Sequence, residues 1–121
     1  MKYRVNRKDN GHKYGAVRTE VDGHKFASKA EAKRYGELKL LEKAGKIAHL
    51  TLQPSFMLLV WDCEVKHDVQ IGSYVADFQY WDMEQEKIVI EDVKGVRTPV
   101  YQLKKKIVEH RFGITISEIT K

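Results

Sequence analysis

The chain has 121 residues, of which 42% are hydrophobic and 32% charged, and its net charge is +5. This balance predicts one compact domain and excludes a disordered chain. No run reaches the roughly 18 apolar residues of a membrane-spanning helix. The charge is uneven, with +7 over residues 1–46, −7 over 47–92 and +5 over 93–121. Basic ends indicate an anionic partner such as nucleic acid, and the acidic middle needs its own explanation.

The start of the chain and its one cysteine indicate the setting. Residues 1–15 are basic and polar, without the apolar stretch of a signal peptide. They show no apolar period, so we expect a flexible arm followed by a single domain over 16–121. The one cysteine, Cys63, excludes an intramolecular disulfide, and no His or Cys pair has zinc spacing. A cytoplasmic protein without a membrane partner is expected.

A hairpin and a helix are predicted first. Asp22 and Gly23 are typical of a two-residue turn, here between strands near 16–21 and 24–27. A helix over 28–45 follows, because apolar residues recur there at helical spacing and Gly45 can end it. Its inward stripe is expected at Tyr35, Leu38, Leu41 and Ala44.

Three strands are predicted next. Residues 56–61 are continuously apolar, which is typical of a buried strand. Residues 73–81 and 87–95 are expected to form adjacent strands joined by the acidic turn 82–86. The whole run would therefore build the sheet of the domain.

A second helix is predicted over 99–112, with Thr98 as its cap and Pro99 at its first position. A last strand over 113–119 follows it. The inward positions of this helix are expected to be Val100, Leu103 and Ile107. This order of elements predicts an α/β fold of α+β type, a mixed sheet flanked by helices.

Two strands carry carboxylates in apolar surroundings. By period-two alternation, Asp92 and Lys94 share one face of their strand, and Glu91 lies on the other. Asp77 sits within an apolar and aromatic run. A buried carboxylate is costly unless it is paired or binds a cation. The pattern therefore allows a structural ion pair with Lys94, or a site of hard oxygen ligands that suits magnesium.

Glu31 also has two interpretations. With Ser28 it completes a capping box, which alone explains a glutamate at this position. Its spacing from Tyr35 and Leu38 also places it on the core-facing stripe, where it could join Asp77. The two roles are compatible, because a capping carboxylate has a second oxygen.

These residues carry a family resemblance. An Asp, 14 intervening residues and Asp-Val-Lys, with a Glu on the preceding helix, resemble the PD-(D/E)XK nuclease superfamily. The stretches DGHKFASKAEAKRYGELKLLEKAGKIAHLTLQPSF, YVADFQY, VIEDVKG and YQLKKKIVEHRFGI resemble small phage and prophage proteins of that superfamily. In outline they are also similar to the Tn7-type transposon endonuclease catalytic domain and to archaeal-type Holliday-junction resolvases. The resemblance runs from about Tyr14 to Ile119 and implies a restriction-endonuclease-like core.

The resemblance implies a role for each site residue. Glu31 would help to hold or position a metal, Asp77 and Asp92 would be metal ligands, and the carbonyl of Val93 would complete the coordination. Lys94 would position the attacking water. The implied cofactor is Mg²⁺, for which Mn²⁺ can substitute.

Further residues would support this site or bind DNA. Gln53 matches a Gln-Pro element whose role is packing or site support, and Gln102 is a supporting residue or plain surface polarity. Ala76 departs from the family pattern, where a proline is usual. The candidate contacts to the DNA backbone, each of which could also be a solvated surface charge, are Lys25, Lys29, Lys33, Arg34, Arg97, Lys104, Lys105 and Lys106.

The function implied is that of a metal-dependent endodeoxyribonuclease. It would hydrolyse phosphodiester bonds, with branched or junction DNA as the substrate in phage DNA processing or recombination, in the cytoplasm of a bacterial host. Analogy with the resolvases implies a homodimer. The alternatives are a non-catalytic nucleic-acid-binding phage protein on the same fold, and a partner-binding protein whose carboxylates form a stabilising ion pair.

Overall fold

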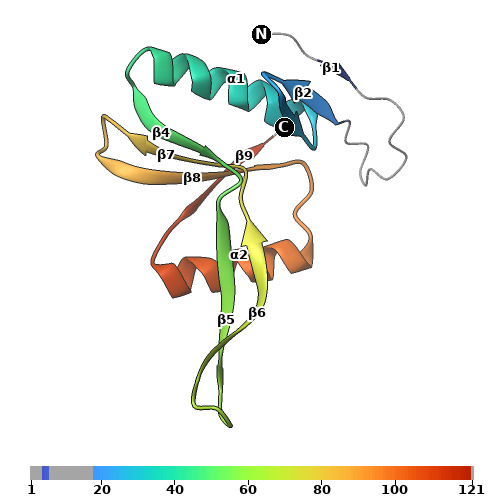
Figure 1. Cartoon of the computed structure of the whole chain (residues 1–121), viewed down its shortest axis with the longest axis vertical. Coiled ribbons are helices and arrows are strands. Elements are labelled where there is room, and N and C mark those ends of the chain that lie inside the picture. The colour runs from blue at the N-terminus through green and yellow to red at the C-terminus, as the bar shows by residue number, and fades with distance from the viewer. Residues whose placement is uncertain (1–3, 6–17, 121) are drawn as a thin grey trace.

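The computed structural model describes residues 4–5 and 18–120 (Figure 1). The arm predicted over 1–15 lies outside the described residues, apart from the two residues that form strand β1. The elements, in chain order, are β1 (Arg4–Val5), β2 (Thr19–Val21), β3 (His24–Phe26), α1 (Lys29–Lys43), β4 (Ile47–Leu52), β5 (Ser55–Asp62), β6 (His67–Val75), β7 (Phe78–Asp82), β8 (Lys87–Lys94), α2 (Pro99–Phe112) and β9 (Ile116–Thr120).

A four-stranded mixed sheet forms the centre, in the order β4-β7-β8-β9. Its first three strands are antiparallel, whereas β9 runs parallel to β8 after the crossover through α2. Helices α1 and α2 lie on opposite sides of this sheet (Figure 1). The mixed sheet with flanking helices confirms the predicted α+β class. Among the described helices, none has the length and apolarity needed to cross a membrane.

The predicted turn and helix ends are present. Asp22 and Gly23 both have positive φ, at 52° and 80°, as a tight turn between antiparallel β2 and β3 requires. The Ser28 side chain accepts a hydrogen bond from the Glu31 N–H at the start of α1, and Gly45 follows the helix at a φ of 76°. In α2, Thr98 caps the first turn and Gly113 ends the helix. These short-range signals therefore placed both helices.

The inward faces of both helices differ from the prediction. In α1, Tyr35 and Leu38 are buried as expected, but Leu41 and Ala44 are exposed, and the small residues Ala32 and Gly36 are buried instead. The half-buried Glu42 takes the next inward position, because its carboxylate accepts hydrogen bonds from Lys39 and from the Leu50 N–H.

In α2 the buried residues are Tyr101 and Val108, with Ile107 partly buried, whereas Val100 and Leu103 are exposed. The prediction was wrong there because Lys105, between the two buried residues, faces inward to an ion pair with Glu118 on β9. The inward face of α2 therefore includes a lysine whose polar partner lies on a distant strand.

The apolar run 56–61 is not a buried strand. It belongs to β5, which pairs with β6 in a separate two-stranded ribbon that projects past α2 (Figure 1). Met57, Val60 and Trp61 are exposed, Trp61 by 61%. Strand β4 was not predicted. The predicted strand 73–81 covers only the end of β6 and is interrupted at Ala76 and Asp77, before β7. The root of the ribbon packs on α2, where Phe56 contacts Phe112, and the Arg111–Asp68 ion pair joins the ribbon to α2 nearer its far turn.

Candidate functional site

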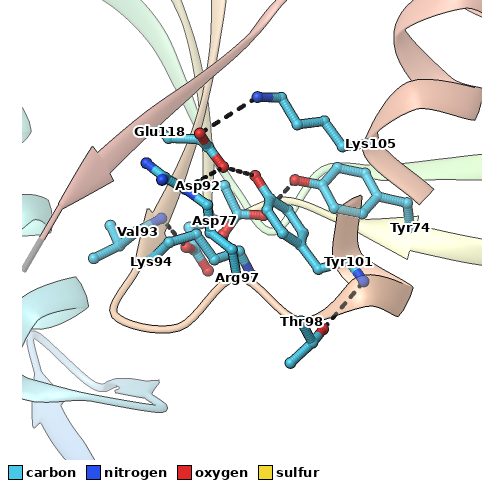
Figure 2. Close-up of polar contacts among 10 residues, drawn as sticks. All are labelled: Tyr74, Asp77, Asp92, Val93, Lys94, Arg97, Thr98, Tyr101, Lys105 and Glu118. Atoms are coloured by element: carbon cyan, nitrogen blue, oxygen red, sulfur yellow. Dashed lines mark hydrogen bonds and ion pairs between the residues drawn. The ribbon is translucent and has the colours of Figure 1, made fainter. Parts of the chain in front are cut away.

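Asp77 and Asp92 meet where β7 begins and β8 ends. Phe78 pairs with Glu91 in the antiparallel register, so Asp77, one residue earlier, lies beside the end of β8. The Asp77 N–H donates to the Glu91 carbonyl at 3.0 Å, and Asp77 Oδ2 accepts a hydrogen bond of 2.6 Å from the Val93 N–H. The structure therefore brings the two predicted aspartates to one place (Figure 2).

Asp92 is 2% exposed and has two side-chain partners. Its Oδ1 lies 3.0 Å from Lys94 Nζ, and its Oδ2 accepts a hydrogen bond from the Tyr74 hydroxyl. Lys94 Nζ also lies 4.0 Å from the centre of the Tyr101 ring, a cation–π contact. The shared face of Asp92 and Lys94 is confirmed, and the ion pair that their spacing allowed is present.

Asp77 is electrostatically strained. Burial, together with the negative charges of Glu31 and Asp92, raises the pKa of Asp77 to about 8, although the Val93 N–H lowers it. The charge of Glu31 therefore acts on Asp77, whereas its role towards a metal stays a prediction. Among residues 18–120, however, no three or more His, Cys, Asp or Glu side chains are grouped as a metal centre.

The carboxylates are not grouped because Asp92 and Glu31 belong to opposite faces of the sheet. Val93 belongs to the core on the α1 side, whereas Ile90 belongs to the core on the α2 side, so alternation turns Asp92 towards α2. Glu31 comes from α1, and its charge and that of Asp92 both act on Asp77. Glu31 also has its capping role, because its N–H donates to Ser28 Oγ at 3.2 Å and its Oε2 accepts from the Ala27 N–H.

Glu91 points to the α1 side and is held by two partners. Arg34 donates to both of its carboxylate oxygens, at 2.8 and 2.7 Å, and the Tyr80 hydroxyl donates to Oε2 at 2.5 Å. Glu91 is 1% exposed. The prediction of Arg34 as a DNA-backbone contact is corrected, because its guanidinium is committed to this buried carboxylate. The hydrogen bond to Glu91 raises the pKa of Arg34 further above its usual value.

Sequence reasoning missed a polar network on the α2 side of Lys94 (Figure 2). Glu118 Oε2 accepts from the Tyr101 hydroxyl at 2.9 Å and from Arg97 Nε at 3.1 Å, and its Oε1 lies 3.5 Å from Lys105. Burial would raise the pKa of Glu118, but the Tyr101 hydrogen bond and the two cations lower it. Burial raises the pKa of Tyr101.

The sequence contains a local signal for Tyr74 but none for Glu118. Tyr74 shares the strand alternation of Ala76, so its inward direction could be read from the sequence. The pairing of Glu118 opposite Asp92 depends on the parallel register of β8 and β9, which no local pattern specifies.

Gln53 and Gln102, the two predicted supporting residues, each donate a hydrogen bond to a backbone carbonyl. Gln53 has a φ of 51°, and its N–H donates to the Asp77 carbonyl at 2.9 Å, while its side chain is exposed. The Gln102 side chain donates to the Arg97 carbonyl at 3.2 Å. Both residues therefore fix the backbone that carries a charged side chain.

The other basic candidates fall into two groups. Lys25, Lys29 and Lys33 are exposed on β3 and α1, whereas Lys104, Lys105 and Lys106 belong to α2 on the other side of the sheet. Arg97 lies in the loop between β8 and α2. The structure therefore does not gather the cations into one patch, and Lys94 and Arg97 are the pair that border one pocket.

Fold and site together define a mixed α/β domain with a carboxylate and lysine cluster at the ends of its central strands. The chain belongs to the family described as "Protein of unknown function (DUF1064)", whose model matches residues 11–120. Comparisons with curated proteins and with solved structures gave no match.

Proposed function

We propose that this protein is a metal-dependent endodeoxyribonuclease of the PD-(D/E)XK type. The observation that carries the proposal is the meeting of Asp77 with Asp92 and Lys94 at the ends of paired central strands, close enough that the negative charge of Asp92 raises the pKa of Asp77. Such clusters are more frequent at functional sites than elsewhere, because a purely structural role does not favour adjacent like charges.

The donor set fits a hard divalent cation. Asp77, Asp92 and the Val93 carbonyl supply oxygen atoms, Glu31 adds negative charge, and Mg²⁺ prefers such ligands. Mg²⁺, or Mn²⁺ in its place, would supply Lewis acidity and a more acidic water. A bound cation would also offset the repulsion between Asp77 and its neighbours Glu31 and Asp92, which raises the pKa of Asp77.

The residues of the chain have separate tasks in this proposal. Lys94 is fixed by Asp92 and by the Tyr101 ring, so its ammonium can donate to the attacking water or to the developing phosphorane charge. Tyr74 orients Asp92 through its hydroxyl. The Arg34–Glu91 pair ties α1 to β8 and thereby sets where Glu31 lies relative to Asp77.

The fold supports the same proposal. Helix α1, the antiparallel strands β4, β7 and β8, helix α2 and the parallel strand β9 are compatible with a restriction-endonuclease-like core, with the β5–β6 ribbon as an insertion. Branched or junction DNA remains the proposed substrate through the resemblance. The implied homodimer would use the ribbon, which leaves large apolar side chains uncovered at Met57, Trp61, Ile71 and Val75.

One observation favours a second candidate, a non-catalytic nucleic-acid-binding protein. Both carboxylate oxygens of Asp92 are engaged within the chain, one by Lys94 and one by Tyr74. A carboxylate that is already neutralised by Lys94 needs no metal ion. Binding of DNA without cleavage would then be the function of this fold.

The deciding experiment is a cleavage panel on branched, flapped, single-stranded and linear DNA, with Mg²⁺, with Mn²⁺ and with EDTA. We expect metal-dependent cleavage that Asp77→Asn, Asp92→Asn and Lys94→Ala each reduce by about 100-fold or more. Matched controls are Lys87→Ala, at the exposed start of β8, and Glu84→Gln in the preceding turn, which should cleave as the parent does. DNA binding that persists in EDTA, with no cleavage of any substrate, would favour the second candidate.

A further inference from the structure

An open pocket of about 300 Å³ adjoins Lys94, and the residues described in its lining are Lys94, Gly95, Arg97 and Thr120. Two of these four carry a positive charge, and none of them is acidic. Gly95 contributes no side chain, which leaves room near the backbone. The pocket is therefore suited in charge to an anion.

Arg97 is held in place although it is exposed. Its side chain is 52% accessible, yet its Nε lies 3.1 Å from Glu118 Oε2. Its backbone carbonyl accepts a hydrogen bond from Gln102, and the next residue, Thr98, caps α2. A long side chain that is already ordered loses less freedom when it binds a ligand.

The carboxylate that holds Arg97 is itself anchored. Glu118 accepts a hydrogen bond from the Tyr101 hydroxyl and forms an ion pair with Lys105. The Tyr101 ring in turn packs against the Lys94 ammonium. One residue of α2 therefore fixes both cations of the pocket, Lys94 through its ring and Arg97 through Glu118 (Figure 2).

We propose that this pocket is a phosphate-binding subsite, in which the Arg97 guanidinium and the Lys94 ammonium together hold a phosphate group of the nucleic acid. The inference rests on the proposed function for its ligand and places a phosphate next to the one that is cut. Because the Arg97 Nε–H donates to Glu118, the planar guanidinium would use its Nη groups for paired hydrogen bonds with phosphate oxygens. That phosphate is either an internal diester of the strand or a terminal monoester.

The first test needs no catalysis. Inorganic phosphate is titrated into the metal-free protein while backbone amide NMR signals are followed. We expect saturable shifts at Gly95, Arg97 and Thr120, and about tenfold weaker binding in Arg97→Gln. Arg97→Lys keeps the charge but loses the planar set of N–H donors of the guanidinium, so it should also weaken binding.

The matched control is Arg111→Gln, since Arg111 is a similarly exposed arginine in an ion pair, with Asp68 on β6. This control should bind phosphate as the parent does. Equal affinity in Arg97→Gln and the parent, or shifts that follow the exposed lysines instead, would overturn the subsite.

A second arm identifies the source of the phosphate. Oligonucleotides with and without a terminal phosphate are compared for binding to the parent and to Arg97→Gln in EDTA. A loss in Arg97→Gln for both oligonucleotides assigns an internal diester, and a loss confined to the phosphorylated one assigns a terminal monoester. A loss for neither oligonucleotide contradicts the subsite.

The same variants separate the two proposals. If phosphate binds through Arg97 but no DNA is cleaved in Mg²⁺, the subsite is supported and the nuclease proposal fails. If DNA is cleaved and Arg97→Gln has an unchanged KM, the nuclease is supported and the subsite fails.

Discussion

The end of β8 and the β5–β6 ribbon use charged and apolar side chains in opposite ways. At the end of β8, Glu91 and Asp92 are buried, and each is paired with groups from another element. Along the ribbon, large apolar side chains are exposed, and Arg111–Asp68 is a surface ion pair that ties it to α2. A buried charge fixes geometry because only its own partner satisfies it, whereas an exposed apolar residue specifies no orientation.

The largest effect is expected for Arg34→Met, which would leave the Glu91 carboxylate buried without its cation. Breaking one side of a buried pair costs about 3–5 kcal/mol of unfolding free energy. The same change at the ribbon, Arg111→Met, removes an exposed pair and should cost about 1 kcal/mol or less. Urea unfolding of both variants measures the contrast.

A double variant sharpens this test. Arg34→Met combined with Glu91→Leu removes both charges and should recover much of the lost stability, because an apolar pair no longer needs a counter-charge. If Arg34→Met were no more destabilising than Arg111→Met, the Arg34–Glu91 pair would not be what ties α1 to β8.

A smaller, pH-dependent effect is expected for Asp77→Asn in the metal-free protein. The pKa of Asp77 is about 4 in the unfolded chain, and burial with the neighbouring carboxylates raises it to about 8 in the fold. Between these values the folded protein keeps a proton that the unfolded chain has released, so stability falls as pH rises. The asparagine should therefore raise the melting temperature more at pH 8.5 than at pH 5.

The comparison across pH carries its own control. Glu84→Gln, a turn carboxylate exposed to solvent, should keep the pH profile of the parent. Mg²⁺ should raise the melting temperature of the parent at pH 8.5 but not that of Asp77→Asn, since a bound cation stabilises the folded state. Parallel pH profiles for parent and Asp77→Asn would contradict the strain assigned to this carboxylate.

What the sequence could predict was set by the range of the signal. The Asp22-Gly23 turn, the Ser28 and Thr98 caps and the shared face of Asp92 and Lys94 depend on residues a few positions apart. The inward face of α2 and the burial of β5 depend on partners more than ten residues away. The run 56–61 is apolar, yet within the described residues β5 has only β6 beside it, so no sheet covers its outer face.

The residues of the candidate site also differ in how far away in the chain their partners lie. Asp92 and Lys94 were predicted to share a face because their spacing is local, whereas Asp77 was singled out by its apolar surroundings and by the family resemblance. Arg34 was assigned to the surface because its partner, Glu91, is 57 residues further along the chain. Tertiary contacts of that separation leave no mark in helical or strand periodicity.

The smallest effect on stability is expected for Trp61→Ser on the ribbon. The side chain is 61% exposed, so its loss should change the unfolding free energy by about 0.5 kcal/mol or less. If the ribbon is the surface of the proposed homodimer, the same change should shift the protein from dimer to monomer in sedimentation velocity, because aromatic residues dominate such interfaces. Leu103→Ser is the matched control, since Leu103 is equally exposed but lies on α2. A parent that sediments as a monomer, or a dimer that Trp61→Ser leaves intact, would remove the ribbon from the interface.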